Sequence, residues 1–164
     1  MLLMTGLYLA ALVVVAYFTR STGRRVAGAL VGGAAASLTG LGMIALCEAL
    51  GWWQLPFVST PSWAIMLYVG LAIPLAPIYL VTWRVSRRFG WRGLAVFVGI
   101  VGIIGPPRDY AYAAMFPKWM VFAPGIAPII ADSAAYVSVV IVGHGVMRLI
   151  AGPAHCDRLA RTPA

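Results

Sequence analysis

Long apolar stretches separated by short polar connections make up most of this 164-residue chain. Five of them are long enough, or nearly so, to cross the hydrocarbon core of a bilayer, which takes about 20 helical residues. A spanning segment must satisfy its own backbone hydrogen bonds, and continuous apolar runs favour helices over a barrel of alternating strands. The sequence therefore predicts an all-α, polytopic integral membrane protein with about five transmembrane helices, at approximately residues 2–18, 26–50, 63–83, 93–105 and 125–150.

Charged residues are too few for an ordinary soluble domain. They make up 10% of the chain, against 62% hydrophobic residues, whereas soluble domains carry roughly 25% charged residues. No polar segment is long enough to fold separately, so residues 1–164 are predicted to form a single transmembrane helical domain. The first stretch has Arg20 after it and no basic residue before it, the reverse of a signal peptide, so we expect it to be retained as a span.

Basic residues are concentrated in alternate connections. Ten of the twelve lysines and arginines follow the first, third or fifth stretch: Arg20, Arg24, Arg25, Arg84, Arg87, Arg88, Arg92, Arg148, Arg158 and Arg161. Arg108 and Lys118 are left for the opposite side. Because basic connections favour the cytoplasm, we predict an outside N-terminus and a cytoplasmic C-terminus in a plasma (inner) membrane. The same asymmetry accounts for the net charge of +8, so no nucleic-acid partner is expected.

Small residues recur at every fourth position of the second stretch, at Gly28, Gly32, Ala36 and Gly40. Such a stripe lies on one helical face and lets another backbone approach closely. Its partner is either a second copy of the chain, in a homo-oligomer, or another helix of the same chain. For a protein with about five spans, we favour the contact within the chain.

The segment "GIIGPPRDYAY" places two prolines and an ion-pair motif at the end of the fourth stretch. Residues 93–105 would span about 20 Å as a helix, which is short of the full core. Either the helix resumes after a kink at Pro106 and Pro107, or the chain leaves the helix and forms a polar outer lid. In both cases Arg108 and Asp109 are expected near the outer interface.

Two further carboxylates are expected at a similar depth. Glu48 falls at the outer end of the second stretch, and Asp132 and Tyr136 share one face of the fifth because they are four residues apart. Carboxylates in membranes usually have partners, so we predict that Arg108 neutralises Asp132, Glu48 or both, and that Asp109 is more solvated. This polar cluster is either a structural clamp between helices or a small outward-facing pocket.

His144 is a candidate axial ligand for a haem or chlorophyll, because it is flanked by Gly143 and Gly145 and imidazole binds metals readily. A second membrane histidine is missing, so a structural hydrogen bond is the favoured role and no metal site is predicted. Trp52, Trp53 and Trp63 are predicted to form an aromatic belt at the outer membrane interface.

The sequence contains none of the common catalytic or phosphate-binding motifs. We therefore expect a non-catalytic membrane protein, either an accessory subunit of a membrane assembly or a binder of a lipid-like ligand. Beyond the bilayer itself, its expected partner is another membrane protein or a second copy of the chain. The alternative is a compact membrane enzyme or transporter that uses Glu48, Arg108, Asp109 and Asp132. The cofactor, if there is one, is left open.

Overall fold

The computed structural model describes the backbone of residues 2–56 and 61–152 and the side chains of residues 6–56 and 72–152. These residues form α1 (Leu2–Phe18), α2 (Gly23–Ala49), β1 (Trp53–Gln54), α3 (Pro61–Met115), β2 (Val121–Phe122) and α4 (Ile126–Ala151). Apart from the two short strands, the regular structure is helical, so the predicted all-helical architecture is confirmed. Within the described chain, three helical segments are long and apolar enough to cross a membrane: Gly23–Ala49, Ala72–Met115 and Ile126–Ala151.

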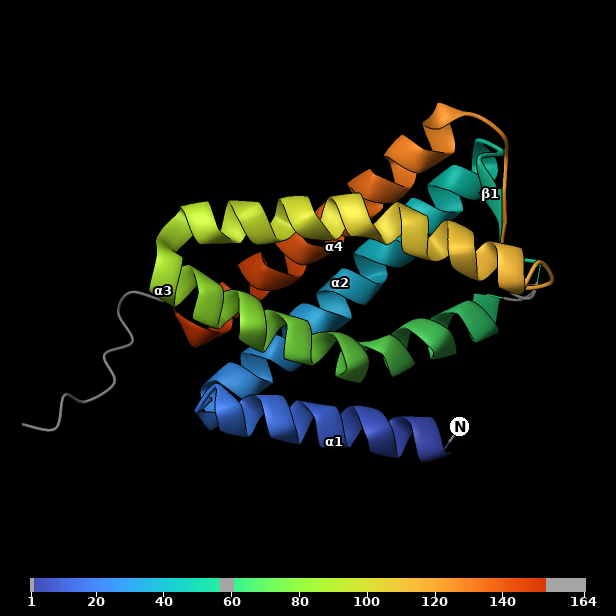
Figure 1. Ribbon diagram of the computed structural model, residues 1–164. Coiled ribbons are helices and arrows are strands. Elements are labelled where there is room, and N and C mark those ends of the chain that lie inside the picture. The colour runs from blue at the N-terminus through green and yellow to red at the C-terminus, as the bar shows by residue number, and fades with distance from the viewer. Residues whose placement is uncertain (1, 57–60, 153–164) are drawn as a thin grey trace, which may run out of the picture.

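Helix α3 reverses its direction at Gly90, so it consists of two arms, residues 61–89 and 91–115 (Figure 1). Gly90 has φ 66° and ψ −157°, a backbone conformation that a residue with a Cβ atom rarely adopts. The predicted stretches 63–83 and 93–105 therefore lie in the two arms of one helical element. A single residue makes the turn between them.

The second arm continues through Pro106 and Pro107 to Met115. Gly90 is the position of α3 with non-helical dihedral angles, so the polar outer lid that we considered is wrong for residues 106–115. Proline already has a helical φ, and its main costs are one missing donor and contact with the preceding turn. Gly102 and Gly105 lie against Val137 and Tyr136, so this arm packs closely on α4.

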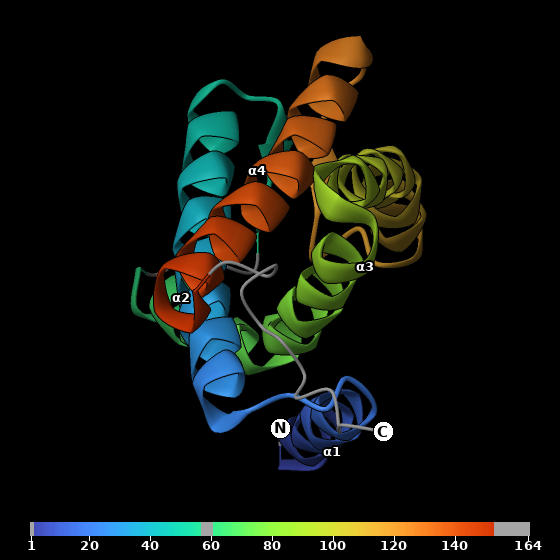
Figure 2. The same cartoon turned by 90° about the vertical axis from the view of Figure 1, so that its left-hand side faces the viewer.

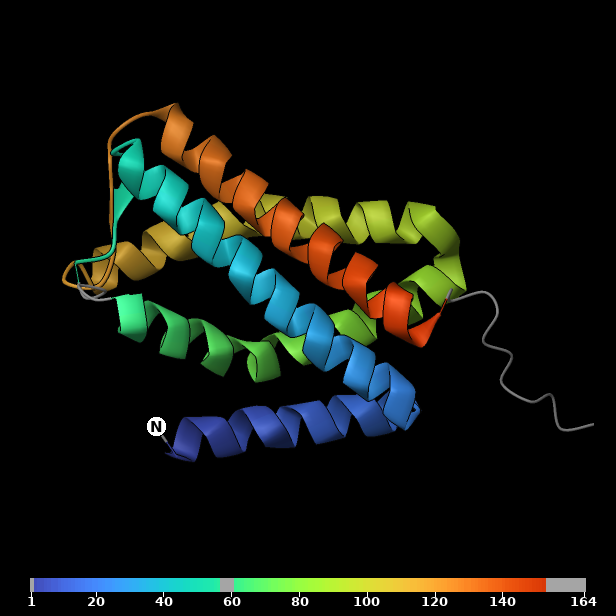
Figure 3. The same ribbon diagram turned by 180° about the vertical axis from the view of Figure 1, so that it is seen from behind.

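Gly28 and Gly32 of the small-residue stripe face α4 of the same chain, and the two helices lie alongside each other (Figure 3). A Cβ atom on Gly28 would lie 3.1 Å from the carbonyl oxygen of Met147, and one on Gly32 would collide with the carbonyl oxygen of Gly143. Ala36 is fully buried. The close approach expected from the sequence is therefore made within the chain.

Helix α1 lies at one edge of the bundle, as seen from the end where α3 reverses (Figure 2). At the other end, β1 and β2 pair antiparallel, with Trp53 opposite Phe122. The side chain of Trp53 is 2% exposed, and its ring meets that of Phe122 edge to face, with 5.7 Å between the centroids. The prediction that Trp53 belongs to an interfacial belt is therefore wrong, because its side chain is buried in a cluster with Cys47 and Ala131. Trp63 lies outside the described side chains.

Candidate functional site

A cavity of about 570 Å³ lies between α2, both arms of α3 and α4. Most of its wall is aliphatic or aromatic, with Ile44 from α2, Ile78 and Phe97 from the two arms of α3, and Val139 from α4. Ala36 and Gly40 of the small-residue stripe also line it. The volume falls in the range of about 300–1,000 Å³ that is typical of small-molecule sites. The shape and lining suit the hydrocarbon part of a ligand.

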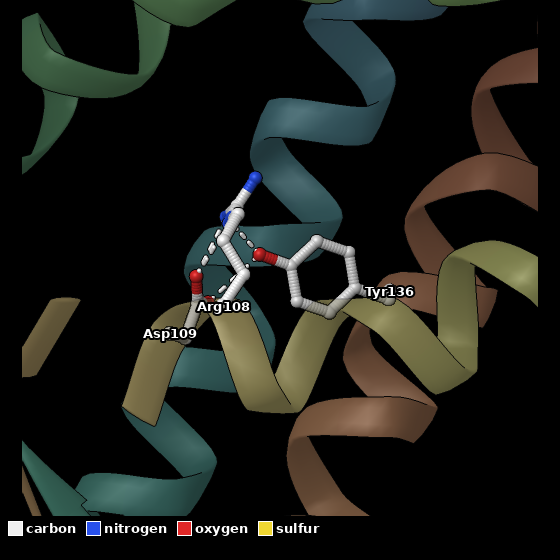
Figure 4. Close-up of polar contacts among 3 residues, drawn as sticks. All are labelled: Arg108, Asp109 and Tyr136. Atoms are coloured by element: carbon white, nitrogen blue, oxygen red, sulfur yellow. Dashed lines mark hydrogen bonds and ion pairs between the residues drawn. The ribbon is translucent and has the colours of Figure 1, made fainter. Parts of the chain in front are cut away.

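Polar side chains line one part of this cavity: Arg108, Asp109, Asp132 and Tyr136. The guanidinium of Arg108 donates two hydrogen bonds to Oδ1 of Asp109, at 2.8 Å from Nε and 2.7 Å from Nη2 (Figure 4). The hydroxyl of Tyr136 donates to Oδ2 of Asp109 at 2.8 Å and also contacts Nη2 of Arg108. The guanidinium carbon lies 5.2 Å from the centre of the Tyr136 ring. These three side chains form one hydrogen-bonded group between α3 and α4.

The ion pair differs from the one predicted from the sequence. Arg108 pairs with Asp109 and not with Asp132 or Glu48, and Asp109 is the more buried partner, with 17% of its side chain exposed against 67% for Arg108. Both residues lie on α3, so the guanidinium and the carboxylate belong to neighbouring residues of one helix. Tyr136 then satisfies the second carboxylate oxygen from α4.

Asp132 is 3% exposed and lines the cavity. Its Oδ2 atom has no hydrogen-bond partner among the described residues. Glu48 is exposed at the end of α2, where its Oε1 accepts a hydrogen bond of 3.0 Å from the amide of Leu55. The structure thus brings Asp132 together with Arg108, Asp109 and Tyr136, whereas Glu48 does not line the cavity and fastens the following connection.

Two cavity residues were missed by the sequence analysis. Trp53 lines the cavity, and its buried indole nitrogen has no hydrogen-bond partner among the described residues. Tyr79 also lines it, and its hydroxyl donates to the carbonyl oxygen of Val139 at 3.0 Å. Neither residue has a spacing pattern that would reveal this, because both depend on contacts between segments far apart in the chain.

His144 lies in a different environment. It is buried and hydrogen-bonded through Nδ1 to Oγ1 of Thr82, at 2.9 Å. The ring of Tyr79 fills the space beside Gly143, so a flat macrocycle cannot approach on that flank as we considered. No group of three or more potential metal ligands occurs in residues 2–56 and 61–152.

The fold and this cavity define a helical protein with three segments able to cross a membrane and an amphiphilic cavity between them. Comparison of the chain with protein-family models, with curated proteins and with solved structures finds no match.

Proposed function

We propose that this chain is a small, non-catalytic integral membrane protein that binds a lipid-like ligand in the cavity between α2, α3 and α4. The observation that carries the proposal is the composition of the cavity wall, which is apolar over most of its area and polar around Asp109 and Asp132. A lipid-like molecule has the same division between chain and head group. The alternative, an enzyme or transporter using Glu48 as well, gains no support because Glu48 does not line the cavity.

We further propose that the chain crosses a plasma (inner) membrane five times, with its N-terminus outside and its C-terminus in the cytoplasm. Two crossings are assigned to α3. It reverses at Gly90, and each of its arms, residues 61–89 and 91–115, is about 40 Å long, which is enough to cross the bilayer. The turn at Gly90, the start of α2 and the end of α4 lie toward one end of the molecule (Figure 1). Arg24 donates to the carbonyl oxygen of Ile150 there, at 2.6 Å, which supports a common basic side.

Single cysteines should report this orientation in cells expressing a variant without Cys47 and Cys156. We expect Thr22→Cys and Phe89→Cys to react with a membrane-impermeant maleimide only after the membrane is opened, and Ala114→Cys to react in intact cells. The physical reason is the positive-inside asymmetry. Labelling of Phe89→Cys in intact cells would contradict the orientation.

Filling the cavity should remove its ligand. Ala135 lines the cavity, whereas its neighbour Ala134 is exposed and does not. We expect wild-type protein extracted in mild detergent to retain about one amphiphile per chain, and Ala135→Phe to lose it because the added ring occupies the cavity.

Native mass spectrometry of the wild type, Ala135→Phe and the matched control Ala134→Phe measures this retention. The control adds the same volume on the outer face and should keep the ligand. Equal retention by all three proteins would mean that the cavity is not the binding site.

A further inference from the structure

Asp132 is a cavity residue with a hydrogen-bonding atom that is unsatisfied within the described chain. Its side chain is 97% buried, it lines the cavity, and Oδ2 lacks a partner among the described residues. Moving a carboxylate out of water without a hydrogen bond or a counter-charge is costly. A molecule in the cavity is well placed to supply that missing partner.

The charged side chains of the cavity wall indicate which charge the head group of a ligand should carry. Its wall contains one cationic side chain, Arg108, and two carboxylates, Asp109 and Asp132. The guanidinium of Arg108 is held by two hydrogen bonds to Asp109, so that pair is neutral as a unit. Arg148 is 16 residues from Asp132 on α4, a distance of about 24 Å along the helix, so it cannot act as the counter-charge of Asp132. When ionised, Asp132 is therefore the carboxylate of this wall that has no counter-charge in the part of the chain that the structure describes.

We propose that the cavity selects an aliphatic amine, with its ammonium group against Asp132 and its hydrocarbon chain along the apolar wall. This inference rests on the proposed function, which it deepens by naming the head group. An ammonium donates charge-assisted hydrogen bonds, which are stronger than those of a neutral hydroxyl. The aromatic ring of Trp53, which also lines the cavity, attracts a cation. A carboxylate or phosphate head is repelled by Asp132.

Three probes with the same chain test the head group: dodecylamine, dodecanol and dodecanoate. Each is added to the full-length protein in nanodiscs of phosphatidylcholine, and its dissociation constant is taken from the rise of the unfolding midpoint with concentration. Native mass spectrometry counts the bound molecules. We expect dodecylamine to bind at least tenfold more tightly than dodecanol, and dodecanoate to bind more weakly than both.

The variant Asp132→Asn should weaken dodecylamine binding at least tenfold and leave dodecanol binding unchanged. Glu48→Gln is the matched control, because it also removes a carboxylate but from outside the cavity, and it should change neither. The control separates the site from general attraction of amines to a negative surface. Should Asp132→Asn fail to fold, the ranking of the three probes on the wild type decides alone.

The possible failures are distinguishable. If dodecanol or dodecanoate binds as tightly as dodecylamine, or if Asp132→Asn leaves dodecylamine binding unchanged, the amine inference is overturned while the cavity remains a ligand site. If none of the three probes binds, or Ala135→Phe binds them as well as the wild type does, the proposed function itself fails.

Discussion

Replacing Gly32 by leucine is expected to lower the free energy of unfolding by about 3 kcal/mol, because overpacking a close backbone contact leaves no room to adjust. The Cβ atom alone would collide with the carbonyl oxygen of Gly143 on α4. If the atom met by the new side chain belonged to a flexible side chain, it could move aside. The carbonyl oxygen of Gly143 belongs to a helical backbone and cannot. Helices α2 and α4 would therefore have to separate and lose the packing between them.

Gly42 of the same helix provides the matched control. It is exposed, and a Cβ atom there would meet nothing within 4 Å. We expect Gly42→Leu to keep the wild-type unfolding midpoint when both variants are unfolded by heat or by dodecyl sulfate. If Gly32→Leu proved as stable as Gly42→Leu, the α2–α4 contact described above would be wrong.

Replacing Arg108 by alanine is expected to cost about 2 kcal/mol of stability, because it removes two hydrogen bonds to a charged group. The exposed guanidinium contributes little to stability by itself. The cost arises because the Asp109 side chain is only 17% exposed and would lose its counter-charge. Tyr136 would remain as a hydrogen-bond donor to that carboxylate. Lys118 is exposed beyond the end of α3, so Lys118→Ala should have little effect.

A pair of double-mutant cycles identifies the partner of Arg108. The structure predicts that Asp109→Asn recovers part of the stability lost in Arg108→Ala, since no unpaired carboxylate is then left. It predicts no comparable recovery from Asp132→Asn. The sequence alone led to the opposite expectation, so a larger coupling with Asp132 than with Asp109 would favour that first interpretation.

The helical architecture was predictable because hydropathy is summed over about 20 residues in each span and tolerates local irregularities. The stripe at Gly28 and Gly32 was also readable, because its period of four residues follows directly from helix geometry. The grouping of Arg108, Asp109, Asp132 and Tyr136 required only the rise per residue, although the same reasoning also included Glu48, which does not line the cavity. These features depend on one helix at a time.

The pairing within that group could not be derived in the same way. Whether Arg108 reaches Asp109 or Asp132 depends on how α3 and α4 are rotated about their axes, and a helical turn of 100° per residue makes small differences decisive. The burial of Trp53 depends on contacts with Cys47 of α2 and Ala131 of α4, and its strand is too short to leave a sequence pattern. The helical path through Pro106 and Pro107 accompanies close packing of Gly102 and Gly105 against α4, a contact between helices that no local pattern records.

The strand pair also changes how the walls of the cavity can move. Because Trp53 pairs with Phe122, the strands that precede and follow α3 in the chain are held together, while Gly90 joins the two arms of α3 at the other end. Spreading the two arms at the strand end would therefore strain this pairing. A molecule too bulky for the cavity would require the strands to part, the arms of α3 to turn at Gly90, or α2 and α4 to shift against α3. If the two arms of α3 have to spread for a ligand to enter, entry of the ligand and opening of the β1–β2 pair would be the same event.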